Sequence, residues 1–211
     1  MSNRERTHVY IDGFNFYYGC IKGGSCKWLD FLKLCQRELP QNDIRLIRYF
    51  TALVDARPGD PQQPIRQQTY LRALSTVPDL EIHYGKFLSS NVDMRLANPP
   101  PAGPERVLVI KTEEKGSDVN LATYLLCDVF DKRCDVAVVI SNDTDLTEPI
   151  RIVRDRFGIK VGVLSPFAKV SWPLRNAATF YRPIRRNLLK QCQLPETLTD
   201  ARGTITKPST W

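Results

Sequence analysis

Four aspartates lie in three well-separated segments of the chain. Asp12 lies in VYIDGFNFYY, Asp118 in EKGSDVNLATYLL, and Asp143 and Asp145 in VAVVISNDTDL. Like charges gathered in one place repel one another unless a cation lies among them. Mg²⁺ and Mn²⁺ are hard ions that prefer oxygen ligands, which carboxylates supply. If the fold brings these segments together, the sequence predicts a Mg²⁺ or Mn²⁺ site with Asp12, Asp118, Asp143 and Asp145 as ligands.

The elements around these aspartates alternate between strands and helices. Apolar or β-branched runs predict strands at 8–12, 44–54, 80–88, 106–111, 135–141 and 159–165, with a further short strand before 184. Helical patterns occupy 13–21, 28–39, 65–74, 117–130 and 146–158, and a loop or hairpin tip is expected over 89–104. This order predicts one α/β domain with a parallel sheet and helices on both faces. The carboxyl ends of its strands would line a ligand crevice.

Each aspartate also has a simpler structural explanation. Asp12 precedes Gly13 and suits a turn, and Asp118, Asp143 and Asp145 lie where helix N-caps are expected. Independent caps would not need to share one end of one sheet, whereas a metal site would. The combined pattern therefore favours the metal site.

The three motifs YIDGFN, KGSDVNLA and SNDTDL resemble, in this order and at these separations, the NYN domain of the PIN-like nuclease superfamily. The resemblance covers about residues 7–166. It implies a Rossmann-like, PIN-like sheet within a domain that we place at 1–182. It also implies a divalent-metal ribonuclease site in which Asp12, Asp118, Asp143 and Asp145 bind the metal. Asn15 and Ser141 would be neighbouring polar groups, Asn15 in the catalytic set and Ser141 near the substrate.

One position departs from the family pattern. Many relatives carry an aspartate six residues after the KGxD aspartate, and this chain has Tyr124 there. Asp128 lies further along the same expected helix, but nothing in the sequence shows that it substitutes. The number of metal ions is therefore open, and a catalytically weak RNA-binding module remains an alternative.

Phosphodiester hydrolysis fits these residues, because a carboxylate-held metal ion supplies an activated water and neutralises phosphate charge without a protein nucleophile. The sequence contains no GxSxG, no GxxxxGK[ST] and no GxGxxG motif. Haloacid-dehalogenase phosphatases place their nucleophile in a DxD motif on the first strand, whereas the first strand here gives Asp12-Gly-Phe. We therefore expect a metal-dependent ribonuclease, with a phosphatase or DNA-directed 5′ nuclease of related architecture as a further alternative.

Basic and aromatic residues suggest where RNA would bind. The net charge of +7 and pI of about 9.2 favour a polyanionic partner weakly. Lys115 is the best candidate for binding a substrate phosphate. The alternative interpretation is that Lys115 is an ordinary loop lysine exposed to solvent. Of the aromatics after Asp12, core packing is favoured for Phe14, Tyr17 and Tyr18, and Phe16 is left open.

The end of the chain, 183–211, combines basic residues with a polar stretch that lacks periodicity. One interpretation is a partly disordered basic appendage in which Arg185 and Arg186 contact nucleic acid. The other is a segment packed on the domain through Leu188, Leu189 and Leu194.

The remaining features concern the setting of the protein. The start, MSNRERTHVY, has no apolar stretch that could serve as a signal peptide, and no run of 18 apolar residues occurs, so we expect a cytoplasmic protein without a membrane partner. The six cysteines show no CxxC spacing and are interpreted as reduced thiols, and His83 is interpreted as structural. Homo-oligomerisation is left open.

Overall fold

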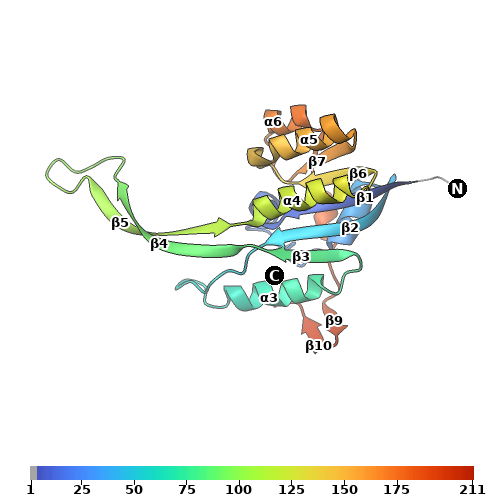
Figure 1. The fold of residues 1–211 in the computed structure, drawn as a ribbon. Helices are drawn as coiled ribbons and strands as arrows, with labels where there is room; N and C mark the ends of the chain where they lie inside the picture. The colour runs from blue at the N-terminus through green and yellow to red at the C-terminus, as the bar shows by residue number, and fades with distance from the viewer. Residues whose placement is uncertain (1–3) are drawn as a thin grey trace.

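The computed structural model describes residues 4–211 and is built around one parallel sheet (Figure 1). This six-stranded sheet has the order β3-β2-β1-β6-β7-β8. Its strands are β1 (Glu5–Asp12), β2 (Asn42–Thr51), β3 (Leu80–Tyr84), β6 (Val136–Ile140), β7 (Lys160–Ser165) and β8 (Phe180–Pro183). Every pairing between them is parallel. The predicted α/β architecture is confirmed.

Helices cover both faces of the sheet, as expected. One face packs against α2 (Phe31–Glu38), α3 (Gln63–Leu74) and α7 (Arg186–Gln191). The other packs against α4 (Ser117–Phe130), α5 (Thr147–Phe157) and α6 (Trp172–Ala177). Among residues 4–211, no helix is long and apolar enough to cross a membrane, and all six cysteines are free thiols.

The central strands β1 and β6 owe their position to their sequence. All residues of β6 are buried, and so are the last six of β1, because a strand covered by helices on both faces needs apolar side chains in succession. After β1 the chain winds outward to β2 and β3, and after β6 it winds the other way to β7 and β8. The direction of winding therefore reverses between β1 and β6, which is where such folds bind ligands.

Two strands leave the sheet to form an arm. β4 (Lys86–Arg95) pairs antiparallel with β5 (Arg106–Lys115), and this ribbon extends well away from the body (Figure 1). The prediction of one strand over 80–88 was wrong, because the chain passes through Gly85 from β3 into the arm. The hairpin expected over 89–104 is present, but its tip is shorter, since β4 runs on to Arg95.

The end of the chain is packed on the body, so the interpretation as a partly disordered appendage was wrong. Beyond 182 lie α7 and a hairpin of β9 (Thr197–Asp200) with β10 (Gly203–Thr206). Leu188, Leu189, Leu194 and Ile205 are buried in the core that includes Trp28. Trp28 Nε1 donates to Pro195 O at 2.7 Å. The sequence of this segment lacks periodicity because each short piece contributes only one or two core residues.

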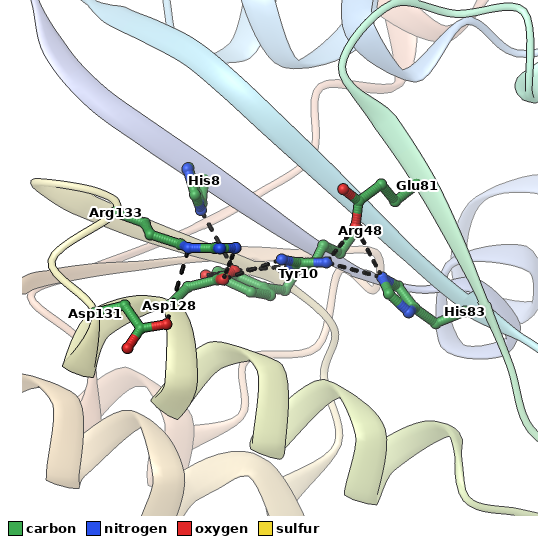
Figure 2. Close-up of polar contacts among 8 residues, drawn as sticks. All are labelled: His8, Tyr10, Arg48, Glu81, His83, Asp128, Asp131 and Arg133. Atoms are coloured by element: carbon green, nitrogen blue, oxygen red, sulfur yellow. Dashed lines mark hydrogen bonds and ion pairs between the residues drawn. The ribbon is translucent and has the colours of Figure 1, made fainter.

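A buried ionic cluster ties α4 to the sheet (Figure 2). Asp128 on α4 is 2% exposed and accepts hydrogen bonds from Arg48 Nε at 2.8 Å and from the Tyr10 hydroxyl at 2.9 Å. His8 Nδ1 lies 3.4 Å from the same carboxylate. Burial alone would raise the pKa of Asp128, but hydrogen bonds from His8 and Arg48 and the charge of Arg48 outweigh it and hold that pKa well below its usual range.

Tyr124 belongs to this cluster rather than to a metal site. Its ring packs on His83 at 4.1 Å between centroids, and the Arg48 guanidinium lies 4.5 Å from the ring centre. His83 is also bonded to Arg48, at 3.0 Å, which agrees with the structural role expected for it. Burial and the charge of Arg48 lower the pKa of His83.

We predict that Asp128→Asn lowers the free energy of unfolding by about 3 kcal/mol at pH 7, because it removes the buried counter-ion of Arg48 and leaves this buried guanidinium only the half-exposed Glu81. The folded-state pKa of Asp128 lies below its unfolded value of about 3.9, so its stabilisation is complete above that pH and is lost as pH falls further. Urea unfolding of both proteins from pH 7 to about pH 3 should show the difference shrinking with acidity. A difference independent of pH would contradict this account.

We also predict that Leu189→Ala, in α7, costs about 2–5 kcal/mol of unfolding free energy, since it opens a cavity in the main core. The neighbouring exposed residue provides the control, and Lys190→Ala should change stability by less than about 0.5 kcal/mol. Equal, small effects in urea unfolding would mean that the tail is not part of the cooperative domain.

Candidate metal centre and adjoining pocket

Three of the four aspartates converge at the carboxyl end of the sheet. Asp12 ends β1, Asp143 follows the adjacent β6, and Asp118 lies in the first turn of α4. Each offers a carboxylate oxygen, and these oxygens all lie within 4.8 Å of one another. Neighbouring parallel strands thus deliver two of the acids, and the helix that follows the arm delivers the third.

Asp12 is held by its own turn and by β6. Its Oδ1 accepts from the Asn15 backbone N–H at 2.9 Å, capping the short helix α1 (Gly13–Phe16), and its Oδ2 accepts from the Ser141 hydroxyl at 2.9 Å. A side chain at position 13 would meet Phe50 O at 2.6 Å, so only glycine lets the chain turn here. The turn expected from Asp-Gly is therefore present, Asp12 also caps the helix that follows, and both features orient the carboxylate.

Ser141 and Asn15 link the first and third aspartates. The Ser141 hydroxyl accepts from the Asp143 N–H at 3.0 Å while donating to Asp12. The Asn15 side-chain oxygen accepts from the Asn142 N–H at 2.8 Å. Both side chains thus fix the loop after β6 against the loop after β1. Through these bonds Ser141 positions Asp12 and Asp143, and its contact with substrate stays a prediction.

The start of α4 positions Asp118. Gly116 adopts a φ of +99°, a conformation that residues with side chains rarely adopt, and the helix begins at the next residue. Ser117 donates to Glu114 Oε1 through its hydroxyl at 2.7 Å and its N–H at 3.2 Å. Glu114, at the end of β5, therefore braces the helix start and adds a further negative charge beside the site.

The electrostatics of the site favour a bound cation. Burial raises the pKa of Asp12 to about 6, against the opposing hydrogen bonds from Asn15 and Ser141. The pKa of Asp118 is also raised to about 6, first by burial and then by the charges of Asp12 and Asp143. The charged forms of these acids are thus destabilised in the protein alone, and a divalent cation would remove that cost.

The donor set fits Mg²⁺ or Mn²⁺. Both are oxygen-seeking ions, and Mg²⁺ binds oxygen at about 2.1 Å, so two oxygens on one ion lie at most about 4.2 Å apart. The carboxylates at this centre need to move only slightly to meet that limit. Asp145 is outside this group of three: it is exposed, and its N–H donates to Asp143 Oδ1 at 3.0 Å. Its role as a ligand stays a prediction.

A pocket of about 570 Å³ opens beside the three carboxylates. Its walls are rich in aromatic side chains, which are Phe14, Phe16, Tyr17, Tyr18, Phe31, Tyr49, Tyr70, Phe87, Phe167 and Trp211. The aromatics after Asp12 differ from expectation. Phe16 is core, at 2% exposure, whereas Tyr17 and Tyr18 are 36% and 51% exposed and face solvent at the pocket.

The basic residues of the pocket are not those expected from the sequence. Lys27, Arg57 and Arg66 line it, and Arg66 is paired with Asp60. Lys115 does not line it, because side chains alternate along a strand and Glu114 takes the pocket side. Lys115 instead lies 3.4 Å from Glu113.

The tail arginines are engaged elsewhere. Arg185 Nε donates to Glu38 at 3.2 Å, and Arg186 donates to the carbonyls of Cys20 and Pro166 at 3.1 Å each. Their guanidinium groups hold the tail on the body, so the structure gives no support to the expected contacts with nucleic acid.

Sequence reasoning missed Glu114 and the two arginines of the pocket. The acidic pair before KGSD was a usable signal for Glu114, since it lies next to a recognised motif. Arg57 and Arg66 had no such signal, because both lie far from the motifs. Arg57 lies in a polar, proline-containing turn, and Arg66 lies in a helix whose polar side chains are expected to face solvent.

We predict that Asp118→Asn raises the melting temperature at pH 8 in metal-free buffer, since it removes one of three mutually repelling charges. Mn²⁺ should stabilise the wild-type protein by binding its folded state, and should stabilise this variant less. Asp155→Asn, on the exposed surface of α5, is the matched comparison and should retain the Mn²⁺ effect. Thermal scans with and without Mn²⁺ decide, and an equal Mn²⁺ effect in wild type and Asp118→Asn would refute metal binding at this centre.

Comparison with known proteins identifies the family. The model of the NYN domain matches residues 6–185. A 6-hydroxy-3-succinoylpyridine 3-monooxygenase from Pseudomonas putida is 33% identical over 237 aligned positions, covering 98% of this chain and 75% of that protein. A crystal structure of a protein of unknown function from Vibrio parahaemolyticus matches with a TM-score of 0.57 and 16% identity, over 88% of this chain and 96% of the other. With its three acidic motifs gathered at one centre and the domain match spanning most of its length, the chain belongs to the NYN domain family.

Proposed function

We propose that this protein is a metal-dependent ribonuclease that hydrolyses phosphodiester bonds in unpaired RNA. The observation that carries the proposal is the convergence of Asp12, Asp118 and Asp143 on one point beside an aromatic pocket. NYN membership points to a nuclease, and the choice of RNA follows from the resemblance of the three motifs. Mg²⁺ or Mn²⁺ would be held by the three carboxylates.

A metal ion held there would activate water and neutralise charge on the phosphate. The residues of the chain provide the setting for that chemistry. Ser141 and Asn15 fix the two strand-end loops, so the acids need not reorganise when substrate binds. Tyr17 and Tyr18 present exposed rings on which an unpaired base can stack, and Arg57 offers a positive charge at the same pocket.

A base in a duplex cannot enter such a pocket unless its base pair is broken. The proposal therefore favours single-stranded segments and loops over continuous duplex RNA. The formal net charge of +7 also favours a polyanionic substrate such as RNA.

A second candidate follows from the monooxygenase relative. The name of that protein gives 6-hydroxy-3-succinoylpyridine, an aromatic acid, as its substrate. The pocket beside the acidic centre combines aromatic walls with Lys27, Arg57 and Arg66. Hydroxylation of such a ring requires O₂ and an electron donor. The sequence has no GxGxxG fingerprint for a dinucleotide, which favours the hydrolytic function.

We predict that the purified protein with Mn²⁺ cleaves labelled single-stranded RNA, and that Asp143→Asn lowers the rate by at least about 100-fold. Asp155→Asn, on the exposed surface of α5, should retain wild-type activity. The same preparation is assayed with single-stranded DNA, duplex RNA and a phosphomonoester. RNA binding without cleavage would identify a binding module, and preferred turnover of DNA or the phosphomonoester would identify the nuclease or phosphatase alternative.

A parallel assay with 6-hydroxy-3-succinoylpyridine, O₂ and reduced nicotinamide tests the second candidate. Substrate-dependent oxidation of the nicotinamide, together with inactivity on RNA, would replace the ribonuclease proposal. Equal RNA cleavage by equally purified wild type and Asp143→Asn would reject the assigned centre.

A further inference from the structure

The β4–β5 arm exposes apolar side chains far from the core. Leu108 and Ile110 on β5 are 70% and 78% exposed, and Leu88 and Met94 on β4 are also exposed. A two-stranded ribbon alone is at best marginally stable in water, whereas three or more strands with an apolar face are stable. Within residues 4–211, the arm forms a sheet of only two strands, so both of its long edges lack a strand partner.

We propose that β5 pairs with β5 of a second copy of this chain, antiparallel and about a two-fold axis at Ile110, to form a four-stranded ribbon. A symmetric dimer places the same surface on both copies, so the edge must complement itself. The hydrogen-bonding phase of the arm and its charge pattern both meet this requirement.

The hydrogen-bonding phase is fixed at the base of the hairpin tip. Leu96 N donates to Glu105 O at 2.8 Å, which makes these residues a hydrogen-bonded pair. Because such pairs alternate in an antiparallel ladder, the odd-numbered residues of β5 bond to β4. The backbone groups that point outward therefore belong to Arg106, Leu108, Ile110, Thr112 and Glu114. Only a register that pairs even-numbered residues with one another lets two β5 edges bond.

The charge pattern selects one such register. With Ile110 opposite Ile110 of the second copy, Arg106 lies opposite Glu114 and Leu108 opposite Thr112, each pair occurring twice by symmetry. The same register sets Glu105 opposite Lys115. Opposite charges across neighbouring strands stabilise a sheet, as do apolar pairs. The equivalent arrangement of two β4 edges, about Asn91, would centre on polar side chains and form no such ion pair.

The composition of the arm favours a protein partner over nucleic acid. Its basic side chains (Lys86, Arg95, Arg106, Lys111 and Lys115) are nearly balanced by acidic ones (Asp93, Glu105, Glu113 and Glu114). Arg106 is already paired with Asp93 at 2.6 Å, and Lys111 with Glu113 at 2.8 Å. A surface for a polyanion would carry an excess of free cations. A balanced, apolar ribbon instead suits a second copy of itself.

The pairing has a consequence for the pocket. Thr112 and Glu114 line it, and in the proposed register the second copy brings Arg106 opposite Glu114. Each copy would therefore supply a guanidinium to the rim of the other copy's pocket. The arm would then serve both to join the copies and to complete the rim.

Light scattering and sedimentation equilibrium of the full-length protein test the proposal over about 1–100 µM. The wild-type protein should be a dimer. Ile110→Lys places two like charges at the two-fold axis and should raise the dissociation constant at least about 30-fold. Asn91→Lys is the matched control, since Asn91 is the cross-strand neighbour of Ile110 on the same face and is also exposed. It should remain a dimer.

Cysteine cross-linking tests the register directly. Hydrogen-bonded antiparallel residues have Cα atoms about 5.5 Å apart, within disulfide range. Ile110→Cys should form a covalent dimer on mild oxidation, in contrast to wild type and Asn91→Cys. If Ile110→Lys does not fold, the cross-linking comparison by itself tests the proposed dimer. A monomeric wild type, a dimer that persists in folded Ile110→Lys, equal cross-linking of both cysteine variants, or an arm that binds RNA as a monomer would each overturn the proposal.

Discussion

Repulsion between three carboxylates that share the carboxyl end of one sheet is the constraint on which the rest of this structure depends. Asp12, Asp118 and Asp143 offer carboxylate oxygens within 4.8 Å of one another, and burial and their mutual charge raise the pKa of the first two. The surrounding residues act against that repulsion. Ser141 and Asn15 join the loops after β1 and β6, and Glu114 and Gly116 set the start of α4. The site is thus held in place by the fold before any ligand binds.

A second set of charges on the same face of the sheet is arranged in the opposite way. Asp128, Arg48, His8 and Tyr10 satisfy one another in a buried cluster, and the pKa of Asp128 is lowered rather than raised. Tyr124 packs against this cluster through His83 and Arg48. The helix α4 therefore separates two functions along its length. Its first turn presents Asp118 to the pocket, and its last turns lock the helix onto β1 and β2.

The sequence was sufficient for the parallel sheet of the body, for its two helical layers and for the convergence of three acids, because each depends on local apolar patterns and on strands that end together. The strand expected at 106–111 instead forms part of β5 in the antiparallel arm. The sequence was insufficient where long-range packing determines the position of a residue. The tail gave no periodic signal, since its core residues come from short pieces that fit gaps left by α2 and α3. Lys115, which was expected to bind a phosphate, does not line the pocket, because side chains alternate along β5 and Glu114 takes the pocket side. Arg57 and Arg66 reach the pocket only through the tertiary fold.

The central claim is that Asp12, Asp118 and Asp143 form one divalent-metal centre. Anomalous diffraction from crystals soaked in Mn²⁺ tests it most directly, because the peak locates the ion without reference to activity or substrate. The account predicts a peak at about 2.2 Å from an oxygen of each of the three carboxylates. A well-ordered site without a peak there, or a peak bound by other residues while this centre remains empty, would contradict it.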